Sequence, residues 1–420
     1  MTKRIFFLAF LLGNVMMANA SRMLIPMDDA GQHNHLKAYG IAFMVLQKNE
    51  KVDWLLNYRG GAFVFDHFLE IENECKIRDV SYEVIPEAKY TAILQEISDP
   101  DANMDVVRLE KAPRIAVYTP DGKQPWDDAV TMVLNYAEIP FDKVYDQELQ
   151  EDKLVKYDWL HLHHEDFTGQ YGKFYAGFQQ AAWYIDDQKR NEAMAKKLGF
   201  NKVSQLKLAS AKKIKDFIIG GGYLFAMCSA TDSYDIALSA EGTDICHQVF
   251  DGDAMDPNAQ SSLDYQRCLA FKDFRLVTNY MEYEYSDIDA TNTRRVPMNT
   301  DYFTLFTFSA KFDPVPSMLC QNHTTTVKGF MGQTTAFRNQ VLKSSVTVLG
   351  ENKSAGEARY IHGDLGKGTW TFYGGHDPED YQHAVEDPPT DLNLHPNSPG
   401  YRLILNNVLF PAAKKKPQKT

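Results

Sequence analysis

Cys228 has the surroundings in this chain that most favour nucleophilic chemistry. It lies in GGGYLFAMCSATD, residues 220–232, where a glycine stop and a short apolar run precede a helix-capable run. This order predicts that Cys228 sits at a turn from a strand into a helix. There the helix dipole would lower the pKa of the thiol, and backbone N–H groups could hold an oxyanion. A thiolate would be a competent nucleophile, whereas a buried apolar cysteine would be inert, and the pattern leaves both interpretations open.

His376 is placed to act as a general base. An apolar run over residues 369–373 predicts a strand, and the segment GGHDPE follows it directly. An imidazole at the end of a strand can accept a proton from a cysteine on a neighbouring strand, and a carboxylate close by can orient the ring. Base and nucleophile would then come from separate strands.

A third segment, WLHLHHEDFTG at residues 159–169, predicts a strand that ends near His164. Side chains on a strand alternate between its faces, so His161 and His163 would point one way and His164 the other. Histidines arranged in this way cannot share one metal ion, and we expect neither a metal nor a cofactor. His164 and Glu165 lie at the carboxyl end of the strand, where we expect them to bind substrate.

These segments carry a resemblance. A strand with GGGYL leading to Cys228, and a late strand ending in His-x-Pro-Glu, resemble the class I glutamine amidotransferase-like superfamily. The run GKGTWTFYGGHDPEDY is similar to the trehalose-utilisation branch of that superfamily. LLNYRGGAF, HHEDFTGQYGKF, GGHDPEDYQH and GYRLILNNVLFPA resemble an exported bacterial family that usually carries the label asparagine synthetase B.

The resemblance implies a flavodoxin-like fold and a Cys-His-Glu triad. Cys228 would be the nucleophile, His376 the base and Glu379 the orienting acid. Asp377 is the alternative acid and a further substrate contact, because one extra residue interrupts the His-Pro-Glu pattern. The resemblance also implies that Gly169 and Ser229 donate to the oxyanion.

Two departures from these families bear on function. Amidotransferases have glycine on both sides of the nucleophile, whereas Met227 and Ser229 flank Cys228 here. Genuine asparagine synthetases have an N-terminal catalytic cysteine and an SGG loop for ATP, whereas Thr2 stands near this N-terminus and no SGG occurs. The motifs therefore do not support ATP-dependent asparagine synthesis.

Two functions follow from these patterns. The first is amide hydrolysis or acyl transfer through a thioester, acting on a small molecule or a peptide amide. The alternative is a non-catalytic or trehalose-utilisation-type protein that binds or processes carbohydrate. Aromatic residues over 174–184 and 280–285, which could stack against sugar rings, favour this alternative.

The pattern of elements predicts an α/β protein. Strands and helices alternate from residue 113 onward, which is typical of an open, doubly wound parallel sheet. We expect an N-terminal α/β unit over residues 21–110, a main domain over 111–412 and a basic tail over 413–420. Residues 241–330 interrupt the alternation and are expected to form an insertion.

Charge and targeting signals limit the partners. Lys and Arg number 44 against 56 Asp and Glu, a net charge of −12, which argues against nucleic acid as a partner. Lys3, Arg4, an apolar run and Ala18-Asn19-Ala20 predict a signal peptide over residues 1–20, and hence export to the periplasm or the medium. No later run is apolar for long enough to predict a membrane span. The oligomeric state is left open.

The cysteines give a further expectation for an exported chain. They number five, which is odd, and no two have C-x-x-C spacing. This count predicts two disulfides and one free thiol, with a pairing that the sequence leaves open.

Overall fold

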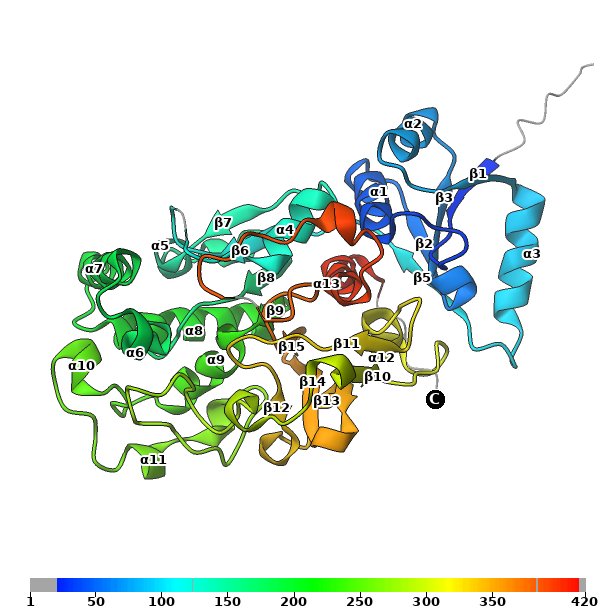
Figure 1. Cartoon of the computed structure of the whole chain (residues 1–420). Helices are drawn as coiled ribbons and strands as arrows, with labels where there is room; N and C mark the ends of the chain where they lie inside the picture. The colour runs from blue at the N-terminus through cyan, green and yellow to red at the C-terminus, as the bar shows by residue number, and fades with distance from the viewer. Residues whose placement is uncertain (1–20, 123, 383, 415–420) are drawn as a thin grey trace, which may run out of the picture.

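The chain folds into a mixed α/β structure built on two sheets (Figure 1). A computed structural model describes residues 21–122, 124–382 and 384–414. The predicted signal peptide, residues 1–20, and residues 415–420 of the predicted basic tail lie outside the described residues. None of the helices in the described ranges combines the length and the apolar character needed to cross a bilayer.

The first sheet is antiparallel and is formed entirely by residues before 110. Its five strands have the order β4-β1-β3-β2-β5. Helix α3 packs on one face, and α1 and α2 pack on the other. The elements are β1 (Ser21–Ile25), α1 (His35–Gln47), β2 (Val52–Leu56), β3 (Ala62–Asp66), α2 (Leu69–Ile77), β4 (Glu83–Pro86), α3 (Glu87–Ser98) and β5 (Asp105–Leu109).

The second sheet has ten strands and is mixed. Along the order β11-β10-β13-β14-β15-β9-β8-β6-β7, neighbours from β15 to β7 are parallel and those from β11 to β15 are antiparallel. Its strands are β6 (Ile115–Tyr118), β7 (Asp142–Val144), β8 (Trp159–Leu162), β9 (Tyr223–Met227), β10 (Tyr302–Leu305), β11 (Thr326–Lys328), β12 (Phe337–Arg338), β13 (Thr347–Asn352), β14 (Glu357–Leu365) and β15 (Gly368–Tyr373).

The antiparallel part was not expected from the sequence. Strand β14 joins β15 through Gly366 and Lys367, with Gly366 at φ 63°. A two-residue link can connect only antiparallel neighbours, because a parallel pair needs a crossover of a dozen or more residues. The expectation of a purely parallel sheet is therefore wrong for this half.

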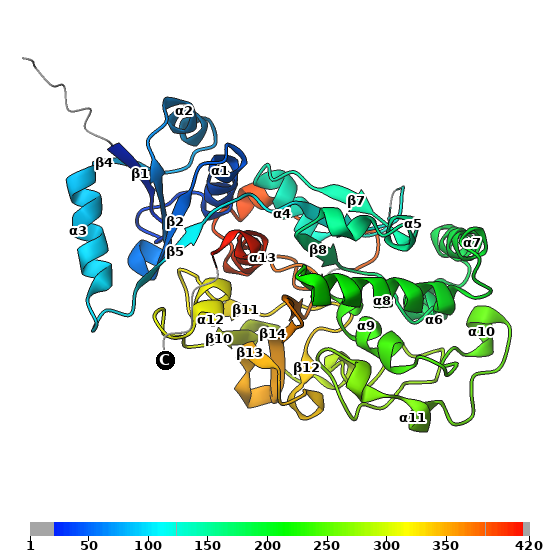
Figure 2. The same ribbon diagram turned by 180° about the vertical axis from the view of Figure 1, so that it is seen from behind.

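Helices cover both faces of the parallel half. Alternate residues of β6 belong to separate cores: Val117 packs in the core that contains α4 and α13, and Tyr118 in the core that contains α8 and α9. Figure 2 shows α8 from behind, lying along the sheet. The helices are α4 (Ala129–Tyr136), α5 (Asp146–Gln150), α6 (Tyr175–Phe178), α7 (Ala182–Lys197), α8 (Val203–Gly220), α9 (Ser229–Ser239), α10 (Gln248–Asp251), α11 (Ala259–Ser262), α12 (Pro314–Leu319) and α13 (Pro399–Leu409).

The two sheets share one hydrophobic core. Helix α13 lies between α1 of the first unit and α4 of the second, and all three belong to the same cluster of buried residues (Figure 1). Arg402 on α13 also donates from Nη1 to the carbonyl of Met27, at 3.1 Å. The last helix thus joins the N-terminal unit to the main sheet.

The cysteines differ from expectation. All five are free and buried, so the predicted disulfides are absent from the structure. Three of the thiols instead donate to backbone carbonyls, Cys246 to Thr168 at 3.1 Å, and Cys268 and Cys320 to partners at 3.3 and 3.4 Å. The reason is that these cysteines pack in separate parts of the core, each against its own backbone partner.

A buried ion pair fastens the expected insertion to the sheet. Arg294 donates from Nη2 to Asp301 Oδ1 and from Nε to Glu357 Oε2, both at 2.8 Å. Burial alone would raise the pKa of Asp301, but Arg294 and the nearby Arg359 outweigh it and hold that pKa below its usual value. Asp301 directly precedes β10, and Glu357 is the first residue of β14. Arg294 therefore holds the start of β10 next to the start of β14.

We expect Asp301→Asn to lower the free energy of unfolding at pH 7 by about 3 kcal/mol, because it leaves Arg294 short of a buried partner. Since the pKa of Asp301 is lower in the folded chain, its stabilisation is complete above the unfolded value of about 3.9 and is lost as pH falls through the folded value. Urea denaturation should therefore show the gap between variant and wild type shrinking below about pH 4. Asp66→Asn, at an exposed pair with Arg22, is the control; an equal gap at pH 7 and pH 3 would contradict the prediction.

Candidate functional site

The carboxyl ends of three neighbouring strands define the site. Strands β8, β9 and β15 are adjacent and parallel, with Leu162 paired to Ala226 and Tyr373 to Met227 where the strands end. Because these ends meet at one edge of the sheet, the residues that follow them are brought together. Those residues are His163 and His164 after β8, Cys228 after β9, and His376 after β15.

Cys228 occupies a strained turn. It stands between β9 and α9, as the sequence predicted, with φ 51° and ψ −140°. A residue other than glycine pays about 1–3 kcal/mol for such a conformation. The carbonyl of Cys228 accepts hydrogen bonds from the Thr231 N–H at 3.2 Å and the Thr231 hydroxyl at 2.7 Å, which hold the turn. Strained strand-to-helix turns of this kind present a nucleophile at the edge of a sheet.

The Cys228 thiol is neutral in this setting. Its burial raises the pKa to about 12, although the backbone N–H groups of Ser229 and Gln333 favour the thiolate. The carboxylates of Asp232 and Asp289 oppose it further. The expectation that the helix end lowers this pKa is therefore wrong, because desolvation outweighs the dipole.

His376 lies on a turn three residues after Tyr373, the last residue of β15. Gly375 turns the chain at φ 98°, and the His376 N–H donates to the carbonyl of Met331 at 2.9 Å. The ring Nε2 lies 3.2 Å from Oδ1 of Asp127. Asp127 precedes α4, and sequence reasoning missed it because no local motif links two positions 249 residues apart.

The two carboxylates after His376 have other partners. Glu379 Oε2 lies 3.1 Å from Nδ1 of His395. Asp377 is fully buried, and its Oδ1 accepts the N–H of Glu379 at 2.9 Å. The contact at Nε2 of His376 is thus made by Asp127, whereas Glu379 was the predicted orienting acid.

A segment just after the expected insertion packs directly on the turn that carries His376. A Cβ on Gly332 would lie 2.6 Å from the backbone nitrogen of His376, so a larger residue would displace that turn. The next residue, Gln333, donates from Nε2 to the carbonyls of Gly172 and Tyr283, both at 2.9 Å. Tyr283 comes from the insertion itself. The site is therefore walled by residues that the sequence analysis did not place near it.

The histidines after β8 do not alternate as predicted. The strand ends at Leu162, so His163 and His164 lie in a bend beyond it. Their rings stack with centroids 4.0 Å apart, and each centroid lies 4.8 Å from that of His376. The expectation that His163 and His164 face opposite sides is wrong, because strand geometry no longer applies to them.

Two adjoining hollows open at this edge. The smaller has about 410 Å³ of empty space and is lined by Cys228, Ser229, His376, Tyr283 and Gln333, among others. The larger has about 590 Å³. Both are lined by Trp126, His164 and Phe174, which form the boundary between them.

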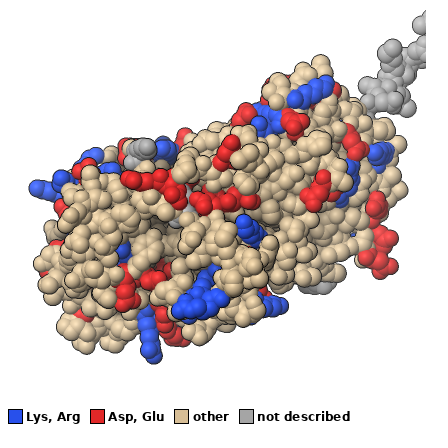
Figure 3. All heavy atoms as spheres, viewed as in Figure 1, with Lys and Arg blue, Asp and Glu red and all other residues tan. Residues whose placement is uncertain are grey.

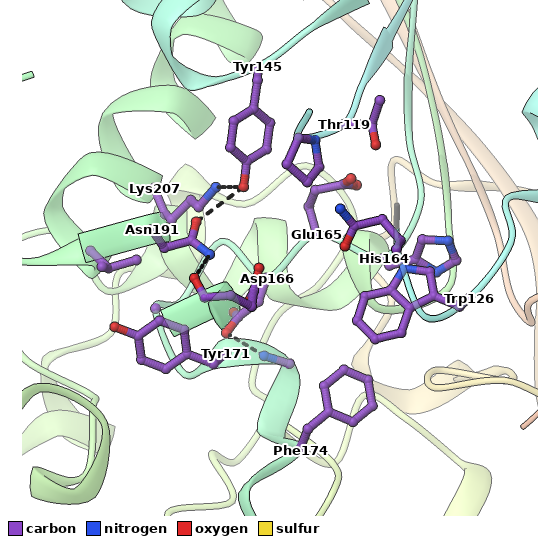
Figure 4. A pocket seen from close by; sticks show the side chains of 16 residues that line it. Thr119, Trp126, Tyr145, His164, Glu165, Asp166, Tyr171, Phe174, Asn191 and Lys207 are labelled. Atoms are coloured by element: carbon purple, nitrogen blue, oxygen red, sulfur yellow. Dashed lines mark hydrogen bonds between the residues drawn. The ribbon is translucent and has the colours of Figure 1, made fainter. Parts of the chain in front are cut away.

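The larger hollow collects polar groups (Figure 4). Burial raises the pKa of Glu165 to about 8, and its Oε2 accepts the N–H of His163 at 2.9 Å. Lys207 donates to Tyr145 at 2.9 Å and to the buried Asp146. Gly169 lines this hollow and Ser229 lines the smaller one, so the two predicted oxyanion donors lie on different sides of the boundary.

We expect Cys228 to alkylate slowly at neutral pH, because its raised pKa keeps the thiol protonated. With iodoacetamide, the rate at Cys228 should rise about tenfold per pH unit from pH 7 to 10, without a plateau, as the thiolate fraction grows. Peptide mapping by mass spectrometry measures this rate for each cysteine separately. A plateau below pH 8.5 would mean that the thiolate is already formed, contrary to the prediction.

Comparisons with known proteins give distant structural likenesses. No protein-family model matches the chain, and no curated protein matches it. Among solved structures, the cytoplasmic proteins STM3548 and STM1381 of Salmonella typhimurium are 10% and 13% identical to this chain. Each alignment covers 72% of this chain and 100% of the other protein, and the TM-scores are 0.35 and 0.34. A GH42 beta-galactosidase is 10% identical over 64% of this chain and 28% of its own, with a TM-score of 0.27. At these TM-scores the likenesses decide neither the fold family nor the activity.

Proposed function

We propose that this chain is an amidotransferase-like hydrolase that cleaves an amide, or transfers its acyl group, through a thioester at Cys228. The observation that carries the proposal is the strained turn of Cys228, which opens into a hollow that His376 also lines. A turn that costs free energy and presents a nucleophile beside an imidazole is an arrangement found at functional sites.

The topology of the parallel strands supports a flavodoxin-like fold for the main domain. Taken in chain order, β6, β7, β8, β9 and β15 are strands one to five, and in space they follow the order 2-1-3-4-5. That order is one of the two common doubly wound arrangements, in which ligands bind beyond the carboxyl ends of the strands. The Cys228 turn lies at such an end.

The proposed mechanism begins with a neutral thiol. As Sγ of Cys228 attacks the carbonyl carbon, His376 takes the thiol proton and returns it to the leaving amine when the C–N bond breaks. Water then cleaves the thioester with the same imidazole as base, which frees the acid and the thiol. Asp127 at Nε2 would hold the ring and stabilise the imidazolium.

An oxyanion would form next to the first turn of α9. The backbone N–H groups of Ser229 and Gln333 already lie beside Sγ, so they are the nearest donors to a carbonyl bound there. Gln333 takes the part that the resemblance gave to Gly169. Export of the chain, which rests on Lys3, Arg4 and Ala18-Asn19-Ala20, is part of the same proposal.

We expect Cys228→Ala to lose amide hydrolysis entirely and His376→Ala to reduce it by about 10²–10⁴-fold, because nucleophile and base would be gone. Asp127→Asn should lower kcat with a smaller change in KM, because the base would be misoriented. Ammonia release from a panel of primary amides and peptide amides, coupled to a dehydrogenase assay, measures the activity.

Two matched variants control this experiment. Cys75→Ala removes a buried thiol from α2, far from the hollows, and should keep full turnover. Glu379→Gln tests the acid predicted from the sequence, which contacts His395, and should keep most of the activity. Turnover retained in folded Cys228→Ala would sink the proposed mechanism.

Carbohydrate binding is a second candidate function, favoured by an aromatic wall. Trp126 stacks on Phe174 at 5.3 Å between centroids and meets Trp183 edge-on at 5.4 Å. Phe174 also contacts Tyr283 at 5.5 Å. Aromatic faces beside polar groups such as Glu165 and Asp166 suit the apolar face and the hydroxyls of a sugar ring (Figure 4).

If the larger hollow binds sugar, Trp126→Ala should weaken glycan affinity at least tenfold, because the stacking face at the boundary is lost. A glycan array followed by isothermal titration calorimetry measures the affinity. Trp370→Phe, at a buried tryptophan in another core cluster, is the control and should bind as the wild type does. Failure of every glycan to bind the wild type would remove this second function.

A further inference from the structure

A cluster of imidazoles lies beside Cys228 that the proposed hydrolysis does not need as a group. His163, His164 and His376 each offer a ring nitrogen, and these three nitrogens lie within 4.8 Å of one another. Hydrolysis uses His376 alone as its base. Three imidazoles packed at this distance need another explanation, because they cannot all carry a proton without strong repulsion.

Two of these rings have a buried nitrogen with no hydrogen-bond partner within the described residues. His163 is 1% exposed, and its Nε2 lacks a hydrogen-bond partner within the described residues. The Nε2 atom of His164 is buried in the same way. A buried polar atom without a partner is costly and calls for a ligand, an ion or a water.

The other nitrogen of His163 faces a carboxylate. Its Nδ1 lies 3.3 Å from Oδ1 of Asp128. The other oxygen of the same carboxylate, Oδ2, lies 3.4 Å from Nε2 of His161. Histidines that bind metals commonly give their second nitrogen to a carboxylate, which fixes the ring and makes the free nitrogen a better ligand. His376, with Nε2 at 3.2 Å from Asp127, has a carboxylate in contact as well.

We propose that His163, His164 and His376 bind a divalent transition-metal ion of the zinc class, in a state that cannot also hydrolyse amides because a ligated His376 is no longer a base. Three neutral imidazoles are a ligand set that Zn²⁺ uses in open, four-coordinate sites. For Zn–N bonds of about 2.0 Å the nitrogens must approach to about 3.3 Å, which requires the stacked rings of His163 and His164 to rotate so that their nitrogens converge on the ion. The carboxylates of Asp127 and Asp128 supply negative charge next to the ion.

Burial favours the protonation state that a ligand requires. Desolvation, together with the neighbouring His163 and His376, lowers the pKa of His164 well below its usual value, so this ring is neutral at pH 7. Other titratable groups facing the cluster include the carboxyls of Asp127, Asp128 and Glu165 and the imidazole of His161, whose centroid lies 5.5 Å from that of His163.

The described residues hold three other groups of possible ligands, and one of them, Asp128, His161 and His163, shares His163 with the proposed site. The remaining two are less suited to a cation. His35, His323 and Asp29 lie close together, but Arg402 Nη1 stands 3.2 Å from Nδ1 of His323 and would repel an ion. Asp244, Cys246 and Asp251 form the other group, and the ammonium of Lys202 already lies 3.0 Å from Asp251 Oδ2. In both groups a positively charged side chain already lies where the metal ion would bind, which is not so at His163 and His164.

The test is metal binding by the full chain after treatment with EDTA. Isothermal titration with Zn²⁺ should give one site per chain, and Co²⁺ should give the intense visible absorption of a four- or five-coordinate site. His164→Ala and His163→Ala should weaken binding by more than the roughly 10- to 100-fold that loss of an outer partner costs. Asp128→Asn keeps the cap of α4 but loses the charge, and should weaken binding by about 10- to 100-fold.

Controls separate this site from others and from the proposed hydrolysis. His323→Ala should bind Zn²⁺ as the wild type does, and so should Cys228→Ser, in which hydrolysis is absent but the imidazoles remain. Circular dichroism checks that each variant is folded; His164 is partly exposed, so its variant serves if His163→Ala fails to fold. No binding by the wild type, binding retained in folded His164→Ala, or binding lost in His323→Ala would overturn the proposal.

Discussion

The parallel pairing of β8, β9 and β15 is the constraint on which the site depends. These strands come from residues far apart in the chain, yet their register brings His163, Cys228 and His376 to one edge. The antiparallel β14 forms the other neighbour of β15 and keeps it in the sheet. If any of the three strands slipped by one residue, the residues that follow it would be displaced by about 3.3 Å along the strand, and the cluster would be lost.

The turns that could be predicted from the sequence are those with a strong signal in the neighbouring residues. The apolar run before Cys228 and the glycines after β15 fixed both turns, because each signal lies within a few residues of its target. Asp127 and Gln333 carry no such signal, since only the folded chain brings them near His376. The antiparallel half follows from one short link at Gly366, which sequence periodicity does not weigh.

Burial governs the chemistry of this edge more than charge does. It raises the pKa values of Cys228 and Glu165 and lowers that of His164, so each group is held in its neutral form. The surface is different: on the face drawn in Figure 3, acidic and basic side chains lie side by side in contact with solvent. The hollow therefore offers proton donors and acceptors in a setting of low polarity, where hydrogen bonds to a substrate are stronger than in water.

The position of α13 has a consequence for how the chain acquires its structure during synthesis. This helix supplies residues such as Leu405 and Val408 to the core of the N-terminal unit, so that core stays incomplete until residues 399–409 have been synthesised. Until then α1 exposes an apolar face. Contacts between α1 and α13 join segments that lie far apart in the chain, and pairings of this kind slow folding, so a chaperone that shields α1 would be of most use until α13 has been made.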